Sequence, residues 1–216
     1  MATTMNTQQV AELLTAVAER MIADKDELQK LDAELGDGDL GRTVSRGFTA
    51  IKEDIAATDD PGNDVGKFVY KQGKTFSNGA PSSFGALFGT VLMTGGKSMR
   101  GKEDISLADI ADATQAALDA LMERGGAKVG DKTMLDAMSP AIAAMKKAAE
   151  DDADMGAFFR AAASAAQKGA EDTKDMQSQI GRASWQQERS VGKMDPGARA
   201  IAMMLEAAAN HTQKEG

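Results

Sequence analysis

The sequence contains no cysteine, only four prolines, and few aromatic residues, which are seven Phe, one Trp and one Tyr. The absence of cysteine excludes a disulfide framework and thiol catalysis. Runs of β-branched residues are nearly missing, which favours an all-helical fold. The longest apolar stretches are far shorter than a membrane span, and the first residues do not form a secretory signal. We therefore expect a cytoplasmic protein without a membrane anchor.

Basic residues are also in the minority, since 25 Lys and Arg stand against 33 Asp and Glu, for a net charge of −8. This balance argues against a nucleic-acid surface, because binding to a phosphate backbone takes clustered Lys and Arg. It does not exclude nucleotide binding, because a bound metal ion carries positive charge to the phosphates. The length of 216 residues predicts a single domain, residues 1–216, with a sizeable core.

The most informative stretch is the glycine-rich segment 31–41, which holds the closely spaced carboxylates of Asp32, Asp37 and Asp39. These groups repel one another unless a cation lies among them, and magnesium prefers oxygen ligands while keeping positions for phosphate and water. The glycines let the backbone bend tightly and let a ligand come close. A helical pattern resumes at about Thr43, and a helix N-terminus favours anions. The stretch therefore predicts a magnesium-nucleotide site.

Other interpretations of this stretch are a solvated turn and the known cation and phosphate loops. A solvated turn stays open, because acidic glycine-rich loops often bind nothing. An EF-hand calcium loop fails on spacing, because its bidentate acid would fall on Phe48 counted from Asp37, or on Thr43 counted from Asp32. The sequence contains no G-x-x-x-x-G-K-[ST] loop, and no G-x-G-x-x-G follows a strand-like run.

Hydrophobic spacing predicts eight helices separated by glycine-rich or polar breaks. Ser106 is expected to cap the fifth helix, and Asp195 and Pro196 to start the eighth. Residues 212–216 are expected to fray. The predicted helices are 7–33, 43–57, 64–76, 84–99, 107–125, 133–150, 155–174 and a last one from 196.

Four breaks differ from the others, because they mix glycine, small hydroxyl residues and charge. In a bundle with antiparallel neighbours, alternate connections lie at the same end. These four breaks are the first, third, fifth and seventh connections, so we predict that they meet at one rim and form one site. They are residues 36–43, 78–89, 125–134 and 181–197.

Three blocks resemble the nucleotide-binding L subunit of dihydroxyacetone kinase. They are residues 36–39 (GDGD), 130–136 (GDKTMLD) and 181–197 (GRASWQQERSVGKMDPG), and the third is long and chemically unusual. The resemblance covers essentially the whole chain, with the blocks in the same order and at similar spacing. It implies an all-α fold, a closed barrel of eight antiparallel helices, with ADP or ATP and two magnesium ions at one end.

The resemblance also implies roles for individual residues. Asp32, Asp37 and Asp39 would hold the two magnesium ions, and no side chain is implied as a phosphorylated intermediate. Backbone amides would face the phosphates at Leu40, Gly41, Arg42 and Thr43, and the third connection would contribute Ser82, Ser83, Phe84 and Gly85. The adenine would lie beside Gly125 and Met134, and a phosphate would pair with Arg182. The far side of the nucleotide would be closed by Asp195, Pro196 and Gly197.

Some of these residues have plainer interpretations, and two positions depart from the family pattern. Met134 is compatible with core packing, and Arg182 with a surface ion pair worth little. Asp195 is compatible with an ordinary helix start. Leu40 and Lys193 stand where the family usually has histidine. Phe84 takes the place of the family's serine, so that Ser82 or Ser83 would supply the hydroxyl.

The function implied by the resemblance is that of a phosphotransferase that acts only within a complex. A ketose-binding kinase subunit would hold the acceptor, and the phosphoryl group would come from exchanging ATP, or from ADP recharged by a phosphocarrier of the phosphotransferase system. A related four-carbon ketose stays open as the acceptor. Two other functions also stay open: a nucleotide-loaded sensor that binds a transcription regulator, and a helical scaffold. We expect no direct contact with nucleic acid or membrane.

Overall fold

The computed structural model describes residues 3–214, and most of this part of the chain is helical. A short antiparallel ribbon pairs β1 (Thr4–Asn6) with β2 (Asp104–Ser106). Two 3-10 segments, η1 (Thr173–Asp175) and η2 (Arg182–Ser190), lie between the last two α-helices. The α-helices are α1 (Thr7–Ala23), α2 (Lys25–Leu35), α3 (Leu40–Ala56), α4 (Val65–Gly79), α5 (Ser83–Ser98), α6 (Leu107–Gly125), α7 (Leu135–Glu150), α8 (Met155–Asp172) and α9 (Pro196–Lys214).

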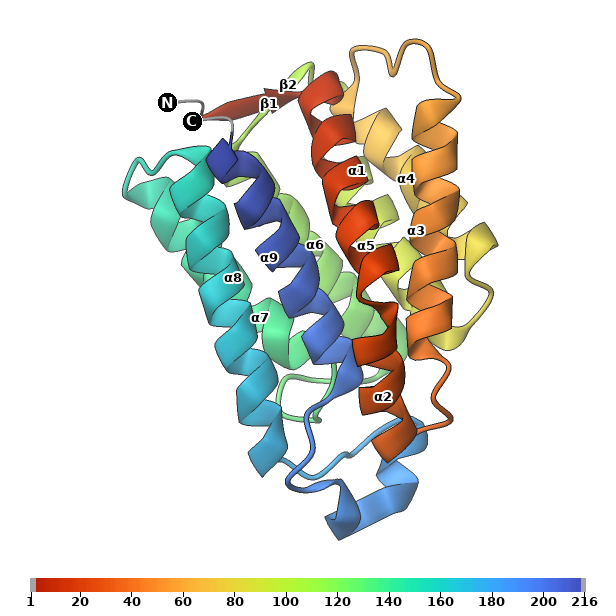
Figure 1. Cartoon of the computed structure of the whole chain (residues 1–216). Helices are drawn as coiled ribbons and strands as arrows, with labels where there is room; N and C mark the ends of the chain where they lie inside the picture. The colour runs from red at the N-terminus through yellow and green to blue at the C-terminus, as the bar shows by residue number, and fades with distance from the viewer. Residues whose placement is uncertain (1–2, 215–216) are drawn as a thin grey trace.

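The helices close into a barrel (Figure 1). α1 packs against α3, and from there each helix packs against the next in the chain until α9, which returns to α1. α2 continues the course of α1 and packs on α3. The predicted all-α fold, a closed barrel of antiparallel helices, is confirmed.

Different side chains fill the two halves of the barrel interior. The buried rings of Phe48, Phe76 and Phe88 contact one another, with centroids 5.1 Å apart for Phe48–Phe76 and 4.8 Å apart for Phe76–Phe88. A Cβ atom on Gly47 would come within 2.4 Å of the Phe76 ring, so the ring packs there only because the residue is glycine. α7, α8 and α9 instead bury many alanines, which lets these helices approach one another closely.

Local capping explains why several helices begin and end where the sequence predicted. The Ser106 hydroxyl accepts a hydrogen bond from the Asp109 amide, and the Asp109 carboxylate accepts one from the Ser106 amide, which forms a capping box before α6. Gly126 ends α6 with φ of +64°, a left-handed conformation that glycine adopts without strain. The predicted start of the last helix at Pro196 is also confirmed.

The predicted first helix was wrong in its extent. It breaks at Asp24, whose backbone leaves the helical conformation, and α2 then runs to Leu35. Asp32 lies in the helical part, as the predicted helix 7–33 implied, but in α2 rather than in a continuous first helix. The break was hidden because apolar spacing continues across Asp24. α3 begins at Leu40 rather than at Thr43, since Asp39 directly precedes the first helical residue.

Four further features differ from the predictions. α4 runs to Gly79 and shortens the third connection to residues 80–82. α7 begins at Leu135, because residues 131–134 form a turn and not the first turn of the helix. The connection between α8 and α9, predicted as a break at 181–197, contains the 3-10 segment η2. Glycines on both sides of η2 made this stretch look like a loop in the sequence. α9 continues through Thr212 to Lys214, so the predicted fraying is wrong for residues 212–214, and residues 215–216 lie outside the described part.

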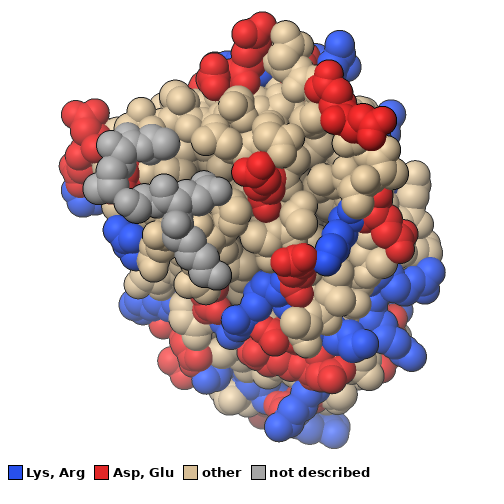
Figure 2. Space-filling model, turned by 45° about the horizontal axis from the view of Figure 1, so that its top comes forward, with Lys and Arg blue, Asp and Glu red and all other residues tan. Residues whose placement is uncertain are grey.

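The connections divide between the two ends of the barrel as the chain topology predicts. The α2–α3, α4–α5, α6–α7 and α8–α9 connections lie toward the lower end in Figure 1, and this end is called the rim below. The opposite end carries the β1–β2 ribbon and both chain ends, and there acids and bases are mixed with wide uncharged areas (Figure 2). Within residues 3–214, no helix is both long and apolar enough to span a bilayer.

Candidate metal and nucleotide site

Three carboxylates converge at the α2–α3 connection. Asp32 lies on the last turn of α2, Asp37 lies in the turn that follows, and Asp39 directly precedes α3. One oxygen from each side chain lies within 4.8 Å of the other two. A set of hard oxygen donors at this spacing suits a magnesium ion, so the predicted ligands are brought together. This group is called the acidic cluster below.

The turn that shapes the acidic cluster is held from within. The Asp32 carboxylate accepts hydrogen bonds from the amides of Asp39, at 2.8 Å, and Leu40, at 3.1 Å. Gly38 has φ of +70°, and a Cβ atom on Gly36 would come within 2.7 Å of the Asp32 carboxylate, so both glycines are needed for this turn. Asp32 therefore positions Asp39 through the backbone and also offers a free oxygen to a cation.

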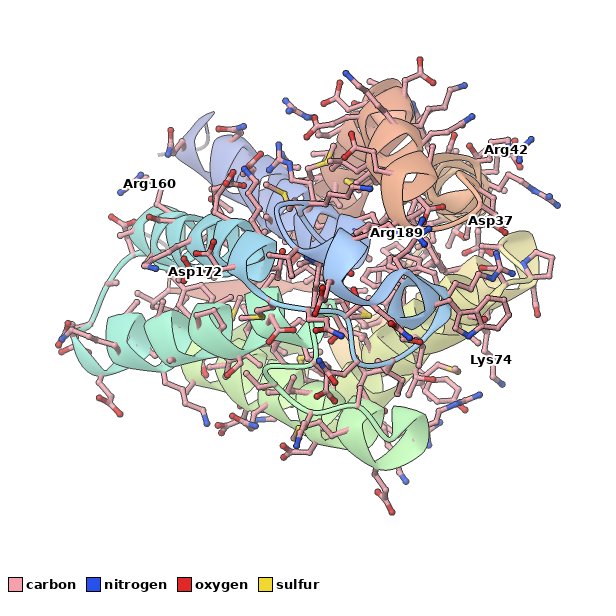
Figure 3. All side chains as sticks on the ribbon, turned by 90° about the horizontal axis from the view of Figure 1, so that it is seen from below. Asp37, Arg42, Lys74, Arg160, Asp172 and Arg189 are labelled. Carbon is pink, nitrogen blue, oxygen red and sulfur yellow. The ribbon has the colours of Figure 1, made fainter. Side chains whose placement is uncertain are left out.

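Arg182, on η2, forms an ion pair with Asp37. Both side chains are largely exposed, so the pair adds little to stability, and its main effect is to hold η2 beside the acidic cluster. Figure 3 looks onto the rim, with Asp37 in the α2–α3 connection, Arg42 in the first turn of α3 and Arg189 on η2. The predicted partner of Arg182 was a phosphate, and in this structure a carboxylate takes that place.

A cleft of about 370 Å³ opens next to the acidic cluster, between the α6–α7 and α8–α9 connections. Its wall is partly apolar, from Leu87, Leu121 and Ala127, and partly polar, from the residues of both connections. This composition suits a heterocycle joined to a charged group. The residues predicted for the site that line this cleft are Asp32, Gly125, Met134, Arg182, Asp195 and Pro196.

A second cleft, of about 260 Å³, lies at the start of α3 and the α4–α5 connection. It gathers four more of the predicted residues, Asp39, Arg42, Thr43 and Ser82. Because Asp32 lines the first cleft and Asp39 the second, the acidic cluster lies between the two clefts. Arg46 also lines the second cleft and was missed, although its position one helical turn after Arg42 was a usable signal.

Other predicted residues lie nearby in supporting positions. Leu40 and Gly41 are buried at the start of α3, and the Thr43 amide donates to the Asp39 carbonyl. The Ser82 hydroxyl caps α5 by accepting from the Gly85 amide at 3.0 Å. The exposed Ser83 and the half-buried Phe84 follow in the first turn of α5, where Phe84 stacks on Phe88, and Gly197 lies beside Met134.

Sequence reasoning missed two residues that shape the α6–α7 connection, Lys132 within it and Asp136 in the first turn of α7. The Asp136 carboxylate accepts from the amides of Gly130, at 2.5 Å, and Thr133, at 2.7 Å, and so fixes the turn between them. Lys132, at the centre of this turn, is buried, and four backbone carbonyls lie within hydrogen-bond distance of its ammonium, whose three N–H donors they share. The usable signal was a lysine between two aspartates, but that pattern alone does not distinguish a buried lysine from a surface one.

Lys193 stands at one of the two positions that depart from the family pattern. Its ammonium donates to the Glu34 carbonyl of α2 at 2.8 Å, which links the last connection to the helix that carries Asp32. Leu40, at the other departing position, turns its side chain into the core and is only 6% exposed. Both residues therefore contribute to the shape of the site through packing and backbone contacts.

Asp195 caps α9, as its carboxylate accepts from the Ala198 amide at 2.7 Å. Its own amide donates to the Thr173 hydroxyl at 2.9 Å. Burial raises the pKa of Asp195 to about 7, the hydrogen bond from Ala198 opposes this rise, and the nearby Asp136 carboxylate adds to it. A carboxyl group that ionises near neutral pH thus lies in the wall of the first cleft.

The Asp195→Asn variant tests this ionisation. Between the ordinary pKa of 3.8 and about 7, the folded protein keeps a proton on Asp195 that the unfolded chain has lost. The free energy of unfolding should therefore fall as the pH rises through this window, by at most about 1.4 kcal/mol per pH unit from this group. Asparagine keeps an acceptor for the helix cap and cannot ionise. The free energy of unfolding of the variant should therefore depend less on pH, and above about pH 7 the variant should be more stable than the wild type.

Urea unfolding of both proteins at several pH values, without magnesium or nucleotide, measures the difference. Equal pH slopes for the variant and the wild type would contradict the raised pKa of Asp195.

Comparison with known proteins places these features in a family. Residues 34–210 match the DAK2 domain. The ADP-binding subunit DhaL of the PEP-dependent dihydroxyacetone kinase of Escherichia coli (strain K12) is 30% identical over 198 residues, which cover 92% of this chain and 93% of that protein. The D-erythrulose kinase of Mycolicibacterium smegmatis is 37% identical over 196 residues, which cover 90% of this chain and 33% of that protein.

A solved structure agrees with this result. The dihydroxyacetone kinase from C. freundii, in complex with AMP-PNP and Mg2+, superposes with a TM-score of 0.74 at 27% identity, over 93% of this chain and 33% of that one. The chain thus spans nearly the full length of the E. coli subunit and about a third of the two longer kinases. Because the matched region takes in most of the chain and the fold agrees with it, the chain belongs to the family of DAK2 domains.

Proposed function

We propose that this chain binds Mg-ADP or Mg-ATP and delivers a phosphoryl group to a ketose held by a partner subunit, as part of a dihydroxyacetone-type kinase. The observation that carries the proposal is the acidic cluster between two clefts at one rim of the barrel. The names of the relatives support it, since one is an ADP-binding kinase subunit and another is a kinase solved with AMP-PNP and Mg2+. Residues 1–216 would form one nucleotide-binding domain.

The acidic cluster would hold two magnesium ions through Asp32, Asp37 and Asp39. When bound, such ions neutralise the charge that shifts between the attacking and leaving oxygens of the phosphoryl group. The Asp32 carboxylate also keeps the Asp39 amide in place, so the ligand geometry is set before any ligand arrives. Arg182 would exchange its carboxylate partner for a phosphate, because a guanidinium binds either oxyanion with the same pair of N–H groups.

The first cleft would take the adenine and ribose, between Gly125 and Met134 on one side and Asp195 and Pro196 on the other. The phosphates would then reach the acidic cluster and the first turn of α3. The amides of Leu40 and Thr43 already donate to the Asp32 carboxylate and the Asp39 carbonyl. Of the four backbone amides predicted to bind phosphate, those of Gly41 and Arg42 would therefore make the contact at this helix N-terminus. Ser82 and Ser83, with Phe84 and Gly85 behind them, would border the second cleft.

The ketose would enter from the rim, held by a ketose-binding kinase subunit. η2 borders the first cleft and carries Trp185, which is 87% exposed and is the only tryptophan of the sequence. An exposed tryptophan beside the clefts suits a contact with that subunit, since tryptophan is frequent at the energetic centres of interfaces. The complex would be cytoplasmic. If the bound nucleotide does not exchange with ATP in solution, a phosphocarrier would rephosphorylate the bound ADP.

Mixing the chain with a ketose-binding subunit, magnesium and ATP tests the proposal. We expect ketose phosphate with dihydroxyacetone as the acceptor, none when magnesium is chelated, and a blue shift of Trp185 fluorescence when the subunits bind. Erythrulose serves as the second acceptor, because a D-erythrulose kinase is among the relatives.

Retention of ADP through dialysis would indicate recharging by a phosphocarrier, whereas rapid exchange would indicate ATP as the substrate. Nucleotide binding without any ketose phosphate would contradict transfer and favour a sensor that binds a transcription regulator.

A further inference from the structure

The connection between α8 and α9 is a loop whose two arms are joined at a neck. The Gly192 amide donates to the Lys174 carbonyl at 2.7 Å, and the Ser178 amide donates to the Ser190 hydroxyl at 2.9 Å. The Gln179 amide donates to the Asp131 carbonyl at 3.1 Å, and residues 180–189 lie beyond this neck. This part supplies residues 180–183 to the wall of the first cleft, so the position of the wall depends on the neck.

The ammonium group of Lys132 joins the two arms of this neck. It donates to the carbonyls of Thr173, at 2.8 Å, and Met176, at 3.1 Å, on the incoming arm. It also donates to the carbonyls of Ser190, at 2.6 Å, and Lys193, at 2.6 Å, on the outgoing arm. The three N–H donors of a single side chain from the α6–α7 connection therefore serve four carbonyls, one donor being shared, and these carbonyls lie 41 to 61 residues away in the sequence.

The surroundings of Lys132 are those of a bound cation rather than of a surface lysine. The residue is 1% exposed, and a buried ammonium is costly unless its N–H donors are satisfied. Lys132 also has φ of +63°, a backbone conformation that non-glycine residues seldom adopt, and this directs the side chain from its turn into the neck. Burial lowers the pKa of Lys132, and the carboxylates of Asp195 and Asp175 oppose that change.

We propose that Lys132 is a positioning residue, a tethered cation whose ammonium clamps both arms of the 173–193 loop and so places Arg182 and its neighbours against the nucleotide. The effect on the nucleotide rests on the function proposed above, whereas the clamp itself does not. Arg182 meets the acidic cluster through Asp37, so the clamp also determines how the loop reaches the metal ligands.

Limited trypsin digestion of the full chain without nucleotide tests the clamp, because trypsin cuts after Arg182 and Arg189 in the part beyond the neck. In Lys132→Ala we expect these cuts to be at least about tenfold faster than in the wild type, since charge-assisted hydrogen bonds to four carbonyls are lost. The matched control is Lys147→Ala, an exposed lysine in the last turn of α7, at the end of the barrel opposite the rim, whose ammonium donates to Asp151. It should leave both cuts unchanged.

Added amines separate a cation requirement from a general packing defect. The alanine variant lacks three carbons and the ammonium, so n-propylammonium should restore the slow cutting. Tetramethylammonium carries the same charge but has no N–H donor, so it should not restore it. Lys132→Met, which keeps the length of the stem, is the second variant. If a variant folds only with an added amine, the same selectivity between the two amines supports the clamp.

Mg-ADP affinity, measured by calorimetry, gives the second readout. We expect Lys132→Ala to bind Mg-ADP at least about tenfold more weakly than the wild type and to recover with n-propylammonium. Unchanged cutting in both variants, or equal rescue by the two amines, would overturn the clamp. Fast cutting with unchanged Mg-ADP affinity would overturn the positioning role alone. Wild-type protein that binds no Mg-ADP would instead contradict the proposed function, and the cutting rates would still decide the clamp.

Discussion

Replacing Asp37 with alanine is expected to abolish magnesium-dependent binding of ADP. The loss in affinity should be at least about 100-fold, because even the outer partners of metal ligands usually cost 10- to 100-fold. Asp37 is exposed, and within residues 3–214 its one ion pair is with Arg182. The fold should therefore be retained. Isothermal calorimetry with Mg-ADP, and with ADP and chelator, measures the effect.

Without ligands, the same variant should be as stable as the wild type or slightly more stable, because three neighbouring carboxylates repel one another. Magnesium alone should raise the melting temperature of the wild type and not that of the variant, since a ligand stabilises the folded state that binds it. The control is Asp59→Ala, which removes an exposed carboxylate at the opposite end of the barrel and makes the same change in net charge. ADP affinity that is unchanged in Asp37→Ala would refute the metal ligands proposed here.

The sequence was informative wherever local chemistry decides the structure. Apolar spacing and caps such as Ser106 depend on residues within one or two turns, so most of the helices followed from them, whereas the closed barrel was implied by the family resemblance. The meeting of four connections at one rim followed from topology alone, because successive antiparallel helices leave alternate connections at the same end. The acidic cluster was predictable from sequence proximity, since Asp32, at the end of α2, and Asp39, just before α3, flank one short connection.

The remaining features depend on contacts between distant residues. The Lys132 ammonium binds carbonyls of another connection, and backbone carbonyls leave no mark on a sequence. The pairing of Arg182 with Asp37 likewise needs two loops to be brought together. The sequence did not indicate the break at Asp24, because the apolar spacing of α1 continues into α2, although α2 packs against α3. Local patterns therefore predicted which residues meet at the rim, and not how the loops there are held.

The second large effect is expected from Gly41→Ala, at the start of α3. A Cβ atom on Gly41 would lie 2.1 Å from the Lys25 carbonyl oxygen and 2.8 Å from the Gln29 Cβ, both on α2. The first of these atoms belongs to the helix backbone, so α2 and α3 must move apart to make room. Forcing extra volume into a packed interior usually costs about 1–3 kcal/mol. For a chain of this size the melting temperature should fall by roughly 2–12 °C.

This displacement should also reach the acidic cluster, because Asp39 lies two residues before Gly41 and its amide bonds to the Asp32 carboxylate. Mg-ADP binding should therefore weaken together with stability. The matched control is Gly95→Ala, also at a buried helical glycine, where the nearest atom to the new Cβ would be the Ala113 carbonyl oxygen at 3.7 Å. That change should leave ADP affinity unaltered and stabilise α5 by about 0.5–1 kcal/mol.

Thermal melting without ligand separates the two reasons for a glycine at position 41. If the glycine served only to let a phosphate approach the backbone, Gly41→Ala would melt like the wild type and lose only its affinity for Mg-ADP. The contact with α2 instead requires the apo protein to melt earlier, because the displaced carbonyl belongs to the fold and not to the ligand. If Gly41→Ala without ligand melted at the same temperature as Gly95→Ala, α2 and α3 would not be in this close contact. The position of Asp39 in the acidic cluster would then depend on other contacts.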